Sequence, residues 1–220
     1  MIVIATYNEA ATIDELLTAL GDDEVVVVDD SSPDGTGDLA RKHPHVTVIT
    51  RPPKSGVASA YLDGFRYALD QQAEWIVQMD AGFTHNPFDV KRMLKLAQET
   101  RADLTIGERQ FKFKGKRTLL SWAARTLMGF TGVHRKDVTS GFRVWRGQFL
   151  RALPLGAVRS KGFAFQLELL WMAEKSRANI NTVPIEYRLT NSSLKWWMVS
   201  EAIGVWYRMF VAKSVSSYAR

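Results

Sequence analysis

A run of four valines, Val25–Val28, constrains the fold more than any other stretch of this chain. Four β-branched residues in succession suit a strand that is buried on both faces, as in a parallel sheet covered by helices. Asp29 and Asp30 follow the run directly, and residues 31–35 (SSPDG) supply turn-forming residues. The sequence therefore predicts two carboxylates at the carboxyl edge of a parallel sheet, where open α/β folds bind ligands. The alternative is a strand that ends in a solvated acidic turn.

Strand-like and helix-like segments alternate along the first 107 residues. The predicted strands span residues 1–5, 25–28, 46–50, 75–79 and 103–107, and the predicted helices span 12–20, 35–43, 56–71 and 87–100. Thr12 and Glu15 have the spacing of a capping box at the first helix. Repeated β–α units predict an α/β fold with a mostly parallel sheet and helices on both faces. A dinucleotide-binding domain is disfavoured, because no G-x-G-x-x-G follows the first strand.

The net charge of +6 divides unevenly between the two halves of the chain. Residues 1–107 contain 9 Lys and Arg against 17 Asp and Glu, and residues 108–220 contain 20 against 6. An acidic half could hold a metal, and a basic half could hold phosphates or face anionic lipid. We expect no nucleic-acid partner, since the basic half contains no nucleic-acid-binding motif. Cysteine is absent and no basic segment precedes the first apolar run, so we expect a cytoplasmic protein without a signal peptide.

Four motifs together carry a resemblance to a known family. They are Thr6-Tyr7-Asn8-Glu9, residues 25–35, Met79-Asp80-Ala81 and residues 139–143 (TSGFR). In this order they resemble the dolichol-phosphate mannose synthase branch of the family 2 glycosyltransferases, over Ile2 to about Lys195. The resemblance implies a GT-A fold, a three-layer sandwich around a mostly parallel sheet. It also implies inverting transfer of a hexose from a GDP- or UDP-linked sugar to a polyprenyl or dolichyl phosphate.

The resemblance divides the chain into a GT-A domain over residues 1–192 and a terminal helix over 193–220. Within the domain, residues 1–107 form the nucleotide-sugar half and 108–192 the acceptor half. The implied donor-binding residues are Thr6, Tyr7, Glu9, Val28, Asp29, Asp30, Asp80 and Ala81. Asp80 is also the implied catalytic and metal-binding carboxylate, because a leaving nucleotide diphosphate needs its developing charge stabilised.

A phosphate acceptor is already an anionic nucleophile, so the acceptor half needs cations more than a general base. The implied acceptor-binding residues are Arg109, Arg117, Ser121, Ser140, Arg143 and Arg188, and Arg117 is also implied to be catalytic. A purely structural turn is the alternative for Ser140 and Arg143. A core-packing helix is the alternative for residues 161–168 (KGFAFQLE), where the resemblance directs Glu168 toward the site.

The metal motif departs from the family pattern at Gly82. The family carries Asp-x-Asp, whereas this chain reads Asp80-Ala81-Gly82 and lacks the second carboxylate. A divalent ion, Mg²⁺ or Mn²⁺, can still bind through one carboxylate, diphosphate oxygens and water, so we expect weakened metal binding. His85 is a candidate substitute ligand, although a surface histidine before the next helix is the simpler interpretation.

The apolar run from Trp196 to Ala212 predicts an interfacial helix on the inner face of the membrane. Ser200, Glu201, Gly204 and Arg208 form a polar stripe, so the helix is too short and too charged to span a bilayer. Its Trp and Tyr rings favour the headgroup level, and residues 111–117 (FKFKGKR) add basic and aromatic side chains. The alternative is a helix docked on its own domain or on a second copy in a homo-oligomer.

Two functional classes remain open on the sequence. The first is an enzyme that transfers a hexose to a polyprenyl phosphate, or to a saccharide acceptor in a close variant. The second, suggested by Gly82, is a non-catalytic membrane-associated protein that binds a nucleotide sugar.

Overall fold

The protein folds around one mixed sheet, as the computed structural model of residues 1–53, 56–110, 116–187 and 196–218 describes it. Seven strands lie in the order β3-β2-β1-β4-β6-β5-β7. Their bounds are β1 Ile2–Thr6, β2 Val25–Asp29, β3 Val46–Thr50, β4 Trp75–Asp80, β5 Leu104–Arg109, β6 Arg143–Arg146 and β7 Ile180–Ile185. All neighbouring pairs are parallel except those that β6 makes with β4 and β5.

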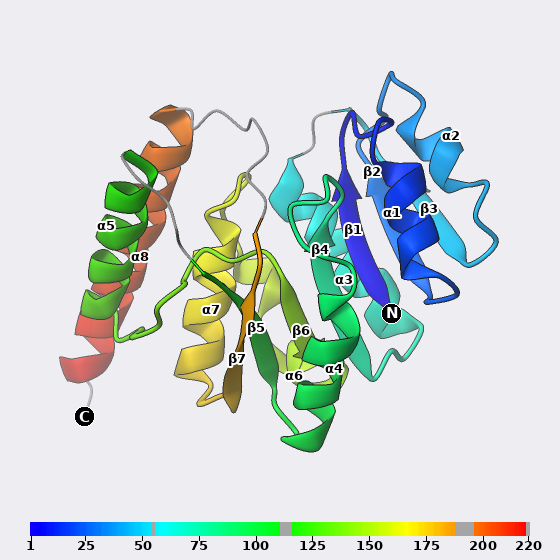
Figure 1. The fold of residues 1–220 in the computed structure, drawn as a ribbon. Coiled ribbons are helices and arrows are strands. Elements are labelled where there is room, and N and C mark those ends of the chain that lie inside the picture. The colour runs from blue at the N-terminus through cyan, green and yellow to red at the C-terminus, as the bar shows by residue number, and fades with distance from the viewer. Residues whose placement is uncertain (54–55, 111–115, 188–195, 219–220) are drawn as a thin grey trace.

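Helices cover both faces of the sheet and give three layers (Figure 1). One face packs on α1 (Ile13–Leu20), α2 (Thr36–Ala40) and α4 (Asp89–Glu99), and the other on α3 (Val57–Asp70), α6 (Gly147–Ala152) and α7 (Phe165–Lys175). The short 3₁₀ helix Leu155–Ala157 follows α6. The predicted three-layer α/β sandwich with a mostly parallel sheet is thus confirmed.

The sequence predicted β1 to β5 within two residues at each end, but it missed β6 and β7. Only four residues long, β6 starts inside a motif that we interpreted as a turn. Its first residue, Arg143, pairs with Gln78 of β4 and Ile106 of β5. The start of β6 therefore lies at the sheet edge where the parallel strands β4 and β5 end.

The capping box predicted at the start of α1 is not formed. Thr12 makes no side-chain bond to the amides of the helix that it precedes. Its hydroxyl instead lies 3.2 Å from the carbonyl oxygen of Glu9 and 3.2 Å from Glu9 Oε2. Because the hydroxyl is engaged by Glu9, three residues earlier, it is not available to the first turn of α1.

The C-terminal helix α8 (Trp196–Tyr218) packs against α5 (Lys116–Phe130) and α7. Figure 1 shows α5 and α8 side by side at the edge of the molecule. Val205 and Met209 are buried in the same cluster as Met128 of α5, and the Trp206 indole donates to the Leu127 carbonyl at 2.7 Å. One face of α8 therefore docks on its own domain, as our alternative interpretation expected. No helix in the described ranges combines the length and apolarity needed to cross a membrane.

Close packing of α3 on the sheet predicts that Gly64→Ala destabilises the fold. A Cβ at Gly64 would overlap the Val3 side chain of β1 and lie 3.1 Å from Val28 Cγ2 of β2. Overpacking of this kind costs about 1–3 kcal/mol of unfolding free energy. Urea unfolding of the wild-type chain and of Gly64→Ala measures this loss of stability. Gly156→Ala is the control, because no atom lies within 4 Å of a Cβ at that position. Equal stabilities would contradict the packing argument.

Candidate active site

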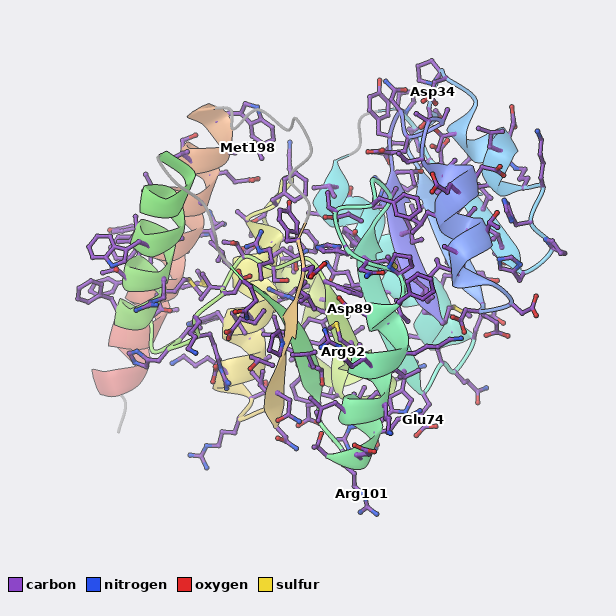
Figure 2. The ribbon with its side chains drawn as sticks, viewed as in Figure 1. Asp34, Glu74, Asp89, Arg92, Arg101 and Met198 are labelled. Atoms are coloured by element: carbon purple, nitrogen blue, oxygen red, sulfur yellow. The ribbon has the colours of Figure 1, made fainter. Side chains whose placement is uncertain are left out.

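The acidic residues predicted from sequence lie at the carboxyl ends of three neighbouring strands. Thr6 ends β1 and pairs with Asp29 at the end of β2, while Ala5 pairs with Asp80 at the end of β4. The strand order reverses at β1, which has β2 on one side and β4 on the other, and such a switch point is a ligand-binding position in open α/β sheets. Figure 2 places Asp34 at this end of the sheet and Arg101 at the opposite end.

The loop after β2 is held in place by two of its own carboxylates. Asp29 accepts bonds from the Ser32 amide at 3.0 Å, the Ser32 hydroxyl and the Thr6 hydroxyl at 3.1 Å. Asp34 accepts from the Thr36 hydroxyl at 2.6 Å and the Ala10 amide at 3.0 Å, and these bonds lower the pKa of Asp34. The resemblance implied donor binding for Asp29, which here supports the loop, and sequence reasoning missed Asp34, whose D-G-T setting is a turn signal.

The remaining predicted donor residues differ in what they can offer a ligand. Asp30 is buried, with Oδ1 3.3 Å from Arg51 Nε and Oδ2 accepting the Gly56 amide at 3.2 Å. Val28 and Ala81 are buried as whole residues, at 0% and 3% exposed, so neither offers a side chain to a ligand. Tyr7 is 41% exposed at the rim.

Asp80 has no lysine or arginine partner in the described part of the chain, and the His85 ring places Nδ1 3.9 Å from Asp80 Oδ2. The Tyr61 hydroxyl of α3 donates to the Met79 carbonyl at 2.8 Å and to Asp80 Oδ1 at 3.1 Å. Burial, followed by the Asp80 charge, raises the pKa of Tyr61 well above its ordinary value, which keeps it a donor. The Asp80 side chain is 31% exposed. A charged, oriented oxygen thus remains available to a ligand.

Glu9 lies beside the position where the family's second carboxylate is missing. A Cβ added to Gly82 would lie 3.5 Å from Glu9 Oε2. Burial raises the pKa of Glu9, the charges of Asp80 and Asp34 add to this, and the Thr12 hydrogen bond opposes it. Negative potential therefore concentrates between Glu9 and Asp80. The two residues are 71 positions apart, so the sequence could not reveal that they are close.

This donor set suits a hard divalent cation that takes most of its ligands from the substrate and water. Asp80 and Glu9 both offer oxygen, the ligand that Mg²⁺ prefers. Within the described ranges, no cluster of three or more His, Asp and Glu side chains is placed to hold a metal ion. The residues therefore fit a metal that is bound together with a diphosphate, rather than one held by the protein alone.

His85 is not the surface histidine that the sequence suggested. The ring is 1% exposed and stacks on Phe142 at 4.8 Å between centroids, and its Nδ1 lies 3.4 Å from the Asp80 amide nitrogen. Burial lowers the pKa of His85, which favours the neutral ring. His85 is therefore enclosed by the protein at the end of β4, where the Phe142 ring stacks on it.

On the predicted acceptor side, the structure brings together Arg109, Ser140 and Arg143. Both arginines bond to other groups of the protein. Arg109 is bound through Nε and Nη2 to the Asp137 carboxylate, both at 2.7 Å. Burial alone would lower the pKa of Arg109, but Asp137 outweighs burial and raises it. Asp137, which sequence reasoning missed, therefore neutralises the cation that we had assigned to the acceptor phosphate.

Arg143 and Ser140 shape the loop before β6 from inside the protein. The Arg143 guanidinium is fully buried and donates to the Ser140 carbonyl at 2.9 Å, and burial lowers its pKa to about 9. Ser140 is also fully buried. Their burial agrees with the structural alternative, and acceptor contact by these two residues stays a prediction. The side chains of Arg117 and Ser121, and the whole of Arg188, lie outside the described residues.

Gln166 of α7 is a third residue, after Asp34 and Asp137, that the sequence did not single out. Its side chain is 2% exposed, and Oε1 has no hydrogen-bond partner within the described chain. Gln166 Nε2 and Asp80 Oδ1 each lie 3.5 Å from the place where a Cβ on Gly141 would be. Because an unpaired buried amide oxygen is costly, Gln166 is poised for a hydrogen-bonding ligand beside Asp80.

Solved structures share this fold at low sequence identity. Glucosyl-3-phosphoglycerate synthase from Mycobacterium tuberculosis, in complex with UDP, superposes with a TM-score of 0.72 at 19% identity, over 95% of this chain and 79% of that chain. Mannosyl-3-phosphoglycerate synthase from Rubrobacter xylanophilus superposes with a TM-score of 0.71 at 17% identity, over 100% of this chain and 74% of that one. These neighbours are GT-A glycosyltransferases, so the chain has the GT-A fold.

Sequence relatives carry the assignment further. This chain is 35% identical to an undecaprenyl-phosphate mannosyltransferase from Micrococcus luteus, over 91% of this chain and 89% of the relative. It is 36% identical to a polyprenol monophosphomannose synthase from Mycolicibacterium smegmatis, over 85% of this chain and 76% of the relative. The family model Glycosyl transferase family 2 matches residues 1–152. The chain therefore belongs to glycosyl transferase family 2 and is a glycosyltransferase.

Proposed function

We propose that this glycosyltransferase moves a hexose, with inversion, from a GDP- or UDP-linked sugar to a polyprenyl phosphate at the inner face of the membrane. Two relatives with 35% and 36% identity are named for transfer to undecaprenyl phosphate and for making polyprenol monophosphomannose, and this carries the choice of acceptor. Family membership favours the enzyme over the non-catalytic binder that Gly82 had suggested.

Asp80 is the residue on which this proposal depends most. An oriented carboxylate with no lysine or arginine partner in the described chain, beside Glu9 at the switch point of the sheet, suits Mg²⁺ or Mn²⁺ bound with the nucleotide diphosphate. Structural neighbours were solved with Mn²⁺ and UDP-glucose. The metal would stabilise the charge that develops on the leaving diphosphate. We assign Tyr7, Glu9 and Asp30 to the nucleoside side of the same pocket.

Asp80→Asn is expected to lower transfer at least about 100-fold, because it removes the charge opposite the diphosphate and its metal. The amide keeps an oxygen for the Tyr61 hydroxyl, so the fold should survive. Transfer of radiolabel from GDP- and UDP-sugars to undecaprenyl phosphate measures the effect. Asp38→Asn is the control, because Asp38 is an exposed residue of α2 that pairs only with the partly exposed Arg41.

Near-normal turnover of Asp80→Asn at saturating donor would contradict the assignment of the donor site. Label that reaches a saccharide but not the lipid would instead contradict the proposed acceptor.

Arg117→Ala is expected to raise the KM for polyprenyl phosphate more than the KM for the nucleotide sugar. We assign the acceptor phosphate to Arg117, since Arg109 is neutralised by Asp137 and Arg143 is buried. Steady-state kinetics with each substrate varied in turn separates the two constants. Arg125→Ala, an exposed arginine of the same helix, is the matched control. Equal changes in both constants would point to a structural role for Arg117.

We infer that the outer face of the α5–α8 pair contacts the membrane. On α8, Ile203, Tyr207 and Phe210 are 38–61% exposed, and Trp122 and Phe130 of α5 are 59% and 58% exposed. Amphipathic rings of this kind settle at the headgroup level of a bilayer. The basic residues of FKFKGKR lead into α5, whose first two residues are Lys116 and Arg117, and would add attraction to anionic lipid.

A triple variant, Ile203→Ser, Tyr207→Ser and Phe210→Ser, is expected to lose the salt-resistant part of vesicle binding. Apolar burial survives high salt, whereas the attraction between lysines and anionic lipid is screened within roughly 10 Å at 0.1 M ionic strength. Flotation with phosphatidylglycerol vesicles at low and high salt measures both parts. Phe88→Ser, an aromatic residue 76% exposed just before α4, is the control. Unchanged flotation of the triple variant in high salt would refute this contact surface.

A further inference from the structure

Four successive backbone amides, in residues 159–162, donate to two glutamates. Glu168 of α7 accepts from the Arg159 amide at 3.2 Å, the Ser160 amide at 3.0 Å and the Ser160 hydroxyl at 2.6 Å. Glu201 of α8 accepts from the next two amides, those of residue 161 at 2.7 Å and residue 162 at 3.0 Å. A loop whose amides all point to side-chain acceptors takes its position from the helices that carry them.

The C-terminal helix supplies half of this arrangement. Glu168 is 6% exposed and its carboxylate lies 3.3 Å from Nη2 of Arg208, which belongs to α8 as Glu201 does. The polar stripe predicted for α8 is thus directed at its own domain. Figure 2 labels Met198, three residues before Glu201, at the same end of the view as Asp34. This places the start of α8 at the end of the molecule where the strands carry the candidate active site.

The other side of the loop fixes the start of α3. The Lys161 carbonyl accepts the Ala58 amide of the first turn at 3.2 Å. Gly56, the N-cap of α3, provides no side-chain cap, so this carbonyl satisfies an amide that a helix start otherwise leaves unpaired. Gly56 has φ +97°, and a Cβ there would lie 2.8 Å from the Lys161 oxygen. The loop and the start of α3 therefore touch through their backbones.

The start of α3 in turn holds Asp30. The Gly56 amide donates to Asp30 Oδ2 at 3.2 Å, and Asp30 is buried next to the acidic loop that follows β2. A continuous path of hydrogen bonds and one backbone contact runs from Glu201 through the Lys161 peptide and Gly56 to Asp30. Every contact along it joins segments that are distant in the sequence.

We propose that Glu201, on the C-terminal helix, is a positioning residue for the nucleotide pocket. Its carboxylate holds the 161–162 peptide against α3 and thereby sets the position of Asp30. The inference rests on the proposed donor role of Asp30, and it adds a function to α8 besides lipid contact. Loss of the carboxylate should weaken donor binding without changing how the protein handles the lipid.

The test compares the full-length chain with Glu201→Ala and Glu201→Gln. The alanine variant should raise the Kd for GDP or UDP with Mn²⁺, and the donor KM, by about 3- to 10-fold, the effect of one or two lost hydrogen bonds. The kcat, the KM for polyprenyl phosphate and vesicle flotation should stay within twofold. The glutamine variant keeps an acceptor oxygen and should recover most of the affinity. Glu99→Ala, an exposed glutamate of α4 in an i,i+4 pair, is the matched control.

Amide hydrogen exchange decides the proposal independently of the chemistry. In Glu201→Ala, exchange should accelerate at residues 161–162 and also at Ala58, with no change in β1 or β2. Faster exchange at 161–162 alone, with unchanged nucleotide affinity, would overturn the proposal. If the wild-type chain bound neither nucleotide, the proposed donor site would fail, and the exchange at Ala58 would still decide whether Glu201 positions α3. Should the alanine variant not fold, the glutamine variant with the same exchange measurement provides the test.

Discussion

Crowding of carboxylates at one edge of the sheet is the constraint on which the rest of the structure depends. Parallel strands bring their carboxyl ends together, so Asp29, Asp30 and Asp80 meet there, joined by Asp34 and Glu9 from the adjoining loops. Like charges this close destabilise a fold unless each is compensated. Asp29 and Asp34 are compensated by amides and hydroxyls, and Asp30 by Arg51. Asp80 and Glu9 are left facing outward with their charge available, which suits an edge that receives a cation and a diphosphate.

In the basic half of the chain, the charges that must be compensated are buried arginines. Burying arginines is expensive unless they are paired, and the chain pairs Arg109 with Asp137, whose side chain is only 1% exposed. Arg143 donates to backbone carbonyls of the loop that it organises, its Nη1 has no hydrogen-bond partner in the described residues, and burial lowers its pKa to about 9. Arginines that matched family positions by sequence are therefore held by the protein itself, in the half that carries most of the positive charge.

Helix α8 shows how one amphipathic element can serve two surfaces. Its buried side places Val205 and Met209 against the domain. Glu201 accepts the amides of residues 161 and 162, and Arg208 pairs with Glu168. Its outer side exposes Ile203 and Tyr207, whereas the Trp197 ring lies against Gly162 of the domain. Apolar packing and polar bonds both hold α8 on the domain. A membrane contact on its outer face would therefore involve a helix that is already part of the domain.

The sequence by itself determined the strands β1 to β5, the helices between them and the placement of Asp29, Asp30 and Asp80 at one edge, because these follow from local periodicity and from the parallel β–α rule. It could not determine β6, which is four residues long and pairs antiparallel with strands 39 and 68 positions earlier. It could not reveal that Asp137 neutralises Arg109, that Glu9 stands beside Gly82, or that α8 reaches the loop at 159–162. Each of these depends on side chains brought within a few ångströms from distant parts of the chain, and tertiary packing alone decides such distances.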